Sequence, residues 1–140
     1  MVPAIDLTSL RKALAMLVEA LGLWGAQPEA SALKPHLRSA VVQSFEFTYE
    51  LSVRMLRRVL IERSVAADLV ADLSFNDLMR KAADAGLLDD PARWREWREM
   101  RNTTSHAYNE AKAQAVATAA ARFVPDAAAL LANLEASLEP

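Results

Sequence analysis

Apolar residues recur at steps of three and four along most of the chain, which is the spacing of one face of an α-helix. One such stripe predicts a helix over about 8–24 and consists of Leu10, Leu14, Leu17 and Leu21. Gly22, Gly25 and Pro28 mark its end. A second helix is predicted over about 35–63, because no breaking residue interrupts that stretch. Its apolar stripe is wide, which indicates a central helix, and is made of Val41, Val42, Phe45, Tyr49, Val53, Leu56, Val59 and Leu60.

The second half of the chain carries its own helix boundaries. Residues 64–74 are predicted to be a connection or a short irregular helix. Ser74 with Asp77 three positions later resembles a capping box and opens a helix that Gly86 closes. Asp90-Pro91 predicts the start of the next helix, which ends near 103–105. A last helix is predicted over about 110–138, with Pro125 breaking or kinking it.

These elements predict an all-α fold, an antiparallel four- or five-helix up-and-down bundle, in a single domain of residues 1–140. The length of 140 residues suits one domain, and the composition agrees, with 53% hydrophobic residues and only 3 glycines. No strand-like alternation of apolar and polar residues is present.

Composition also narrows the classes of function. There is no cysteine and there are two histidines, so neither a metal site nor a cofactor is expected. No secretory signal and no stretch near the roughly 20 apolar residues of a membrane span is recognised, so we expect a cytoplasmic protein that makes no membrane contact. The net charge of −2 excludes a broadly basic nucleic-acid surface, so any RNA contact must be local. Two local arginine clusters exist: Arg54, Arg57, Arg58 and Arg63, and Arg93, Arg95, Arg98 and Arg101.

Residues 101–108 form the one segment whose side chains suit phosphate chemistry. Arg101 is a permanent cation with a planar fork of donors, and His106 can exchange a proton near pH 7. Asn102 and the neighbouring hydroxyl residues can orient a ligand. The alternative from chemistry alone is that these are surface residues capping a helix end.

The same segment resembles a known family. Arg101, His106 and Tyr108 match the Arg-x4-His-x-Tyr motif of HEPN domains encoded beside minimal nucleotidyltransferases. Residues 41–51 resemble that family's central-helix signature, and residues 85–90 with Trp94 resemble its mid-chain segment. The branch that these segments resemble most is that of the nucleotidyltransferase substrate-binding proteins.

The resemblance implies a homodimer that binds a cognate minimal nucleotidyltransferase, and in toxin–antitoxin members a metal-independent ribonuclease that the nucleotidyltransferase silences. It also implies roles for single residues. Arg101 would hold the scissile phosphate, His106 would act as general acid or base, and Asn102 would orient the arginine or the phosphate. Tyr108 would be adenylylated or would contact a second phosphate.

Glu46 is a further candidate, because it shares a face of the predicted central helix with buried positions. A half-buried carboxylate needs a partner, and Arg101 or His106 is the best candidate. The alternatives are a neighbouring arginine or a place at the edge of the stripe. Trp94, Trp97 and Met100 could stack on bases, but the interpretation as core or dimer contact is preferred, and Glu50 is expected to pair with Arg54.

Two functions of different classes follow. The first is an RNA-cleaving toxin with its site at a dimer interface. The second is a non-catalytic module that presents a substrate or nucleotide to a nucleotidyltransferase. The chain lacks the Gly-Ser and paired-aspartate signature of nucleotidyltransferases, so we do not expect it to transfer nucleotides itself.

Overall fold

The computed structural model describes residues 5–105 and 109–139, and the secondary structure within that part is entirely helical. The elements are α1 (Thr8–Ala26), α2 (Lys34–Arg63), α3 (Ala67–Ala71), α4 (Phe75–Asp84), α5 (Pro91–Thr104) and α6 (Glu110–Leu138). The predicted all-α bundle is confirmed. The element beyond the predicted five is α3, a five-residue helix within the segment expected to be a connection or a short irregular helix.

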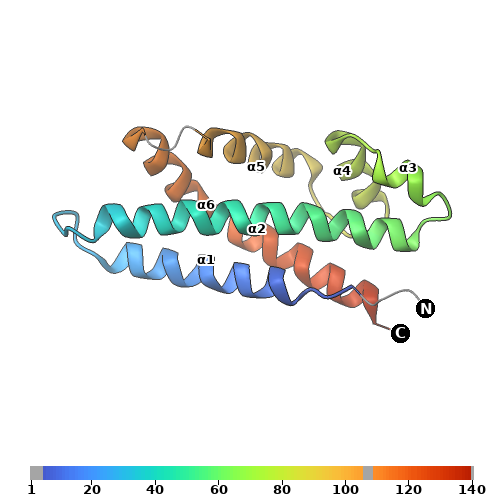
Figure 1. Ribbon diagram of the computed structural model, residues 1–140, viewed down its shortest axis with the longest axis horizontal. Helices are drawn as coiled ribbons and strands as arrows, with labels where there is room; N and C mark the ends of the chain where they lie inside the picture. The colour runs from blue at the N-terminus through green and yellow to red at the C-terminus, as the bar shows by residue number, and fades with distance from the viewer. Residues whose placement is uncertain (1–4, 106–108, 140) are drawn as a thin grey trace.

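The long helices alternate in direction, so that the bundle is of the up-and-down type (Figure 1). Helices α1 and α2 lie side by side and antiparallel and share the largest interface in the molecule. Helix α5 lies on the other side of α2, and α6 crosses behind it, in contact with α1, α2 and α5. The short helices α3 and α4 lie over the carboxyl-terminal end of α2. The central position predicted for α2 is therefore correct.

The predicted helix boundaries follow from local capping. The Ser74 side chain accepts a hydrogen bond from the Asp77 amide at 3.3 Å, and Asp90 accepts from the Ala92 amide at 3.1 Å. Gly86 has a φ of +76°, a left-handed conformation that favours glycine after a helix. The exception is the end of α1, which continues past both of its glycines to Ala26, because packing against α2 outweighs the roughly 1 kcal/mol that each glycine costs a helix.

Helix α6 runs unbroken through Pro125, so of the two outcomes expected there the break does not occur. By length and average hydropathy α6 also meets the criteria for a membrane span, contrary to the expectation that no stretch approaches one. Its fully buried residues pack inside the bundle and include Val116, Phe123 and Leu134. An Ala-rich core helix satisfies the same criteria, so the composition of α6 is weak grounds for a membrane span.

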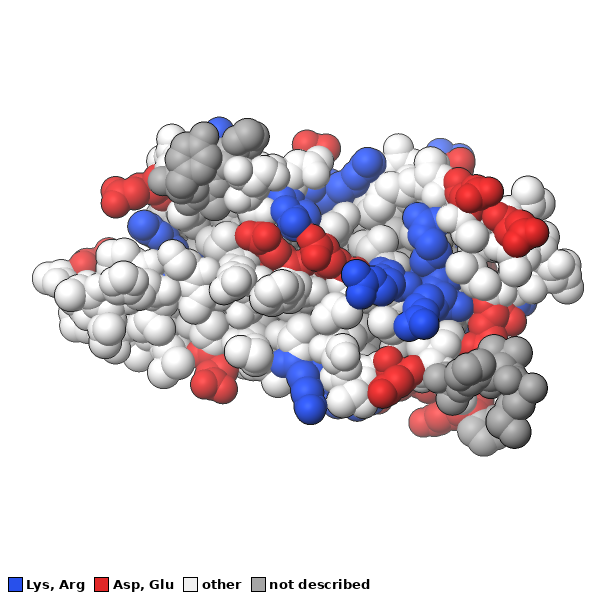
Figure 2. Space-filling model, viewed as in Figure 1, with Lys and Arg blue, Asp and Glu red and all other residues white. Residues whose placement is uncertain are grey.

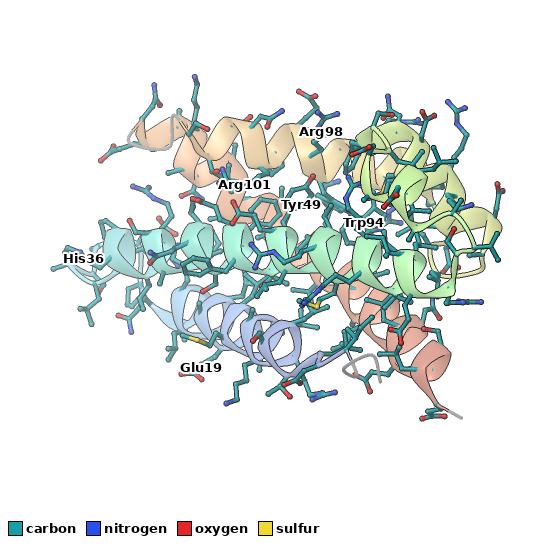
Figure 3. The ribbon with its side chains drawn as sticks, turned by 45° about the vertical axis from the view of Figure 1, so that its right-hand side comes forward. Glu19, His36, Tyr49, Trp94, Arg98 and Arg101 are labelled. Atoms are coloured by element: carbon teal, nitrogen blue, oxygen red, sulfur yellow. The ribbon has the colours of Figure 1, made fainter. Side chains whose placement is uncertain are left out.

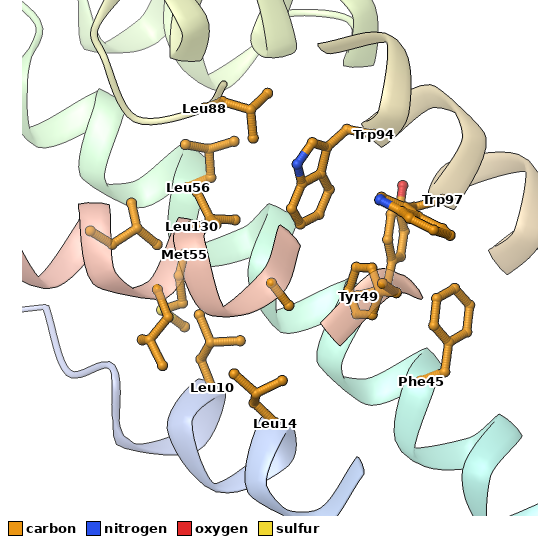
Figure 4. Close-up of a cluster of buried hydrophobic side chains, with 14 of the residues drawn as sticks. Leu10, Leu14, Phe45, Tyr49, Met55, Leu56, Leu88, Trp94, Trp97 and Leu130 are labelled. Carbon is orange, nitrogen blue, oxygen red and sulfur yellow. The ribbon is translucent and has the colours of Figure 1, made fainter. Parts of the chain in front are cut away.

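Aromatic side chains join α2, α5 and α6 into one core (Figure 4). The Phe123 ring lies 5.0 Å from Phe45, 5.5 Å from Trp97 and 5.6 Å from Trp94, measured between centroids, and each pair meets edge to face. Trp94 and Trp97 are only 3% and 2% exposed, so neither offers a free face to a base. The preferred interpretation of the tryptophan stripe as core is confirmed.

Candidate functional site

Arg101 lies in the last turn of α5 and its side chain is held there by its own helix. The Arg101 Nη1 donates to the Thr104 hydroxyl at 2.8 Å, and that hydroxyl donates to the Arg101 carbonyl oxygen at 2.6 Å. Thr104 is buried, whereas the Arg101 side chain keeps 26% of its surface exposed. The guanidinium group is thus held by its own helix, while part of the side chain stays exposed to solvent.

Two glutamates of α2 hold the other side of the guanidinium group. Glu50 Oε1 accepts from Arg101 Nε at 3.0 Å and from Nη2 at 2.6 Å. Glu46 Oε2 lies 3.6 Å from the same Nη2. The two carboxylates are four residues apart, which places them on one face of α2. In Figure 3, Arg101 lies between α5 and α2, next to Tyr49.

The expectation that Glu46 is partly buried and pairs with Arg101 agrees with this geometry, since its side chain is 29% exposed. Whether Glu46 supports a reaction stays a prediction. Glu50 was expected to pair with Arg54, but its carboxylate instead binds Arg101 across the helix interface. The sequence pattern favoured the i,i+4 pair because it cannot show which helix faces α2.

Glu50 and Thr104 are therefore the site residues that sequence reasoning missed. Glu50 had a signal, namely its position one turn after Glu46 on the same helix face. Asn102 is exposed in the last turn of α5, and the residue that binds the Arg101 side chain within that helix is Thr104. The role assigned to Asn102 remains a prediction.

His106 and Tyr108 lie outside the described residues. The structure fixes the chain on both sides of them: α5 ends at Thr104, and Asn109 caps α6 by accepting from the amides of Ala111 at 2.9 Å and Lys112 at 3.3 Å. The end of α5, after which this segment follows in the sequence, lies within one turn of Arg101.

The electrostatics of the site are mixed. Burial raises the pKa of the Tyr49 phenol to about 12, although the guanidinium groups of Arg98 and Arg101 act to lower it. Two carboxylates share the one guanidinium group of Arg101. Its Nη1 donates to Thr104 and its Nε and Nη2 donate to Glu50. Each terminal nitrogen therefore keeps a second N–H that forms no hydrogen bond among the described residues, although Glu46 lies 3.6 Å from Nη2. An incoming anion can accept hydrogen bonds from these N–H groups.

Within the described ranges 5–105 and 109–139, no group of three or more His, Asp and Glu side chains is arranged to hold a metal ion. The chemistry that this part of the site can supply is therefore that of an oriented cation and two neighbouring carboxylates. Such a cation binds phosphate and stabilises negative charge that develops on it.

Comparisons with known proteins show the family of this chain. Residues 5–136 match the family described as nucleotidyltransferase substrate binding protein like. A relative from Haemophilus influenzae, named probable ribonuclease HepT, is 36% identical over 106 residues, which cover 76% of this chain and 73% of the relative. A solved structure from the same organism, described as the fold of a substrate-binding domain of a nucleotidyltransferase, superposes with a TM-score of 0.83 at 32% identity and covers 93% of this chain and 99% of its own. The chain belongs to the nucleotidyltransferase substrate-binding protein family, a branch of the HEPN domains.

Proposed function

We propose that this protein is a metal-independent endoribonuclease that acts as a homodimer and is silenced by a cognate minimal nucleotidyltransferase. The observation that carries the proposal is the oriented, partly exposed guanidinium group of Arg101, which lies at the end of α5 and five residues before His106. The relative named probable ribonuclease HepT supports the same chemistry.

In the proposed reaction the ribose 2′-oxygen attacks the phosphorus and the bond to the 5′-oxygen breaks. Arg101 binds the phosphate and stabilises the charge of the transition state. His106 takes the proton of the 2′-hydroxyl or gives one to the leaving 5′-oxygen. The products are a 2′,3′-cyclic phosphate and a free 5′-hydroxyl, and DNA is not cut because it lacks the attacking hydroxyl.

A homodimer supplies what one chain lacks. A single histidine cannot readily be both base and acid in one turnover, whereas a second copy of the Arg101–His106 pair provides the missing partner. Phe47 supports this arrangement, because it is 54% exposed on α2, one position after Glu46 and three before Glu50. An apolar side chain beside the site is suited to an interface that brings two sites together.

The proposed control by a nucleotidyltransferase uses Tyr108. Transfer of an adenylyl group from ATP to the phenol oxygen, with release of pyrophosphate, would place a negative charge beside Arg101 and compete with RNA phosphate for it. The family match supports association with a nucleotidyltransferase. This chain would then be the target of that enzyme.

Purified, unmodified protein and single-stranded RNA test the proposal. We expect cleavage that persists in a chelator and leaves 2′,3′-cyclic phosphate ends, because neither Arg101 nor His106 needs a metal ion. Arg101→Ala and His106→Ala should each abolish cleavage, while circular dichroism shows a folded protein. Tyr108→Phe should keep activity but escape silencing by the nucleotidyltransferase. Unchanged cleavage by the His106 variant would contradict the proposal.

A non-catalytic module that presents a substrate to a nucleotidyltransferase is the second candidate. The description of the solved relative as a substrate-binding domain favours it. In that case Arg101 grips the phosphate of a nucleotide and no RNA is cut. Absence of cleavage by folded, unmodified dimer, together with nucleotide binding that Arg101→Ala removes, would establish this function instead.

A further inference from the structure

A groove runs along the outer side of α2. Its volume is about 480 Å³. Apolar parts of Tyr49, Val53 and Ile61 form the floor, and arginines form the rim. Figure 2 shows the basic side chains gathered over the carboxyl-terminal half of α2, beside acidic side chains at its middle.

The groove is continuous with the proposed active site. Glu50 lines one end of the groove and is also the carboxylate that binds Arg101 at 2.6 Å. An RNA strand with a phosphate on Arg101 would therefore enter this groove at the end that Glu50 lines. The buried face of α2 is already covered by α1 and α6. Packing of the bundle therefore does not explain why the outer side of α2 combines an apolar floor with a cationic rim.

The three rim arginines do different things. Arg57 is committed to the fold, because its Nη1 donates to the carbonyl oxygens of Val70 at 3.1 Å and Leu73 at 3.0 Å. Arg54 and Arg58 are exposed and make no ion pair within the described part of the chain. They are four residues apart, which places them on one side of α2 at about 6 Å along its axis.

We propose that this groove binds the single-stranded RNA that flanks the phosphate on Arg101, an inference that rests on the proposed ribonuclease function. Arg54 and Arg58 contact successive backbone phosphates, and a base packs against the floor of Tyr49, Val53 and Ile61. Stacking on an apolar floor requires an unpaired base, so the groove favours single strands over duplexes.

Charge supports a polyanion over other occupants. The whole chain has a net charge of −2, yet the groove is lined by three arginines against one carboxylate, that of Glu50. An arginine keeps its charge at every physiological pH and matches the geometry of phosphate oxygens. A local positive groove on an acidic protein favours RNA on a surface that leads to the proposed site.

Binding of a fluorescent single-stranded oligouridylate to the His106→Ala protein tests the proposal, because that background is expected to leave the RNA intact. The double substitution of Arg54→Ala and Arg58→Ala should weaken binding about tenfold at low salt. Loss of two phosphate contacts should also reduce the slope of log affinity against log salt by about 1.4. Arg54→Lys with Arg58→Lys should keep most of that slope, since the charges remain.

Arg80→Ala is the matched control, because Arg80 is exposed on α4 outside the groove. It should leave both affinity and salt slope unchanged. Equal losses in the Arg80 control and the double variant would overturn the proposal, as would an unchanged slope in the double variant. So would a double variant that binds RNA normally but no longer binds the nucleotidyltransferase.

Failure of the groove and failure of the ribonuclease are distinguishable. Binding that depends on Arg54 and Arg58, with no cleavage by unmodified wild type, supports the groove and contradicts the ribonuclease. Cleavage that depends on His106, with normal RNA affinity in the double variant, supports the ribonuclease and contradicts the groove.

Discussion

The guanidinium group of Arg101 is shared by three side chains from two helices. Thr104 fixes it within α5, and Glu50 and Glu46 hold it from α2. Glu50 makes two contacts at or below 3.0 Å, whereas Glu46 makes one at 3.6 Å. The two carboxylates therefore position the arginine unequally, although sequence places them on the same face of one helix.

We predict that Glu46→Gln lowers the rate of RNA cleavage only a few-fold, and that Glu50→Gln lowers it more, because the amide keeps its shape but loses the charge that orients Arg101. Both carboxylates are partly exposed, so each substitution should change the free energy of unfolding by less than about 1 kcal/mol. Single-turnover kinetics measure the rate, and urea unfolding measures stability. A faster reaction in Glu50→Gln would show that this carboxylate competes with phosphate for Arg101.

Tyr49 gives a prediction on pH dependence. Burial raises its pKa from 10.0 to about 12 in the folded protein. Between those values the unfolded chain loses the phenol proton while the folded chain keeps it, so stability present below pH 10 is lost as pH rises. In the wild type this lowers the free energy of unfolding by up to about 2 kcal/mol, and Tyr49→Phe should abolish that decrease. Unfolding measured across this range should show a flatter curve for the variant; identical slopes would contradict the assignment.

At the scale of elements, α5 carries the site and must be held in register with its neighbours. Asp126 of α6 does this from the far side, since its Oδ2 accepts from the Trp97 indole at 2.8 Å and from Arg93 Nε at 3.0 Å. Arg98 adds a contact to α4 by lying 4.8 Å over the Phe75 ring. The position of Arg101 against α2 depends on these contacts along the whole of α5.

We predict that Asp126→Ala destabilises the fold by about 1–3 kcal/mol, because the buried Trp97 indole loses its acceptor. Glu135→Ala is the control, since it removes an exposed pair with Arg11 at 3.5 Å and should cost less than about 1 kcal/mol. Thermal unfolding measures both. Equal effects of the two substitutions would contradict the prediction that the contact between Asp126 and Trp97 stabilises the fold more than an exposed ion pair does.

At the scale of the whole molecule, large exposed apolar side chains lie on α1, on α2 and around α3. Phe47 is the large exposed apolar residue on α2 and lies beside the site, whereas Leu69 lies on α3, next to the carboxyl-terminal end of α2. If two sites face each other across a dimer, the surface that carries Phe47 must lie in the interface. The proposed dimer therefore predicts that Phe47 lies in the interface and that Leu69 lies outside it.

We predict that light scattering gives the mass of two chains at micromolar concentration, and that Phe47→Asp shifts it to the mass of one, because a carboxylate in an apolar interface is left without a partner. Leu69→Asp is the control and should leave the dimer intact. A wild-type mass of one chain would contradict the dimer, and dissociation by Leu69→Asp alone would place the interface elsewhere.

Much of the fold follows from the sequence alone. Periodicity, capping residues and glycines are local signals, and they predicted the extents of α2, α4, α5 and α6 within a few residues because each acts within one or two turns of helix. The tryptophan stripe and the half-buried Glu46 also followed from helical spacing. Helix α1 ends two residues beyond its predicted end, past both of its glycines, and of the two outcomes expected at Pro125 the break does not occur, because packing between helices outweighs a local preference against helix.

The sequence determined one part of the site, and the tertiary structure determined the other. The sequence determined which chemistry the chain offers, an arginine and a histidine five residues apart, because a motif is a property of neighbours along the chain. Only the tertiary structure decided that Glu50 binds Arg101, that Arg57 holds carbonyl groups at the end of α3, and that Arg54 and Arg58 are left on the rim of a groove. These pairings join residues that are 51 and 13 to 16 positions apart, and the packing of whole helices selects them, because a charged side chain pairs with what lies across the interface.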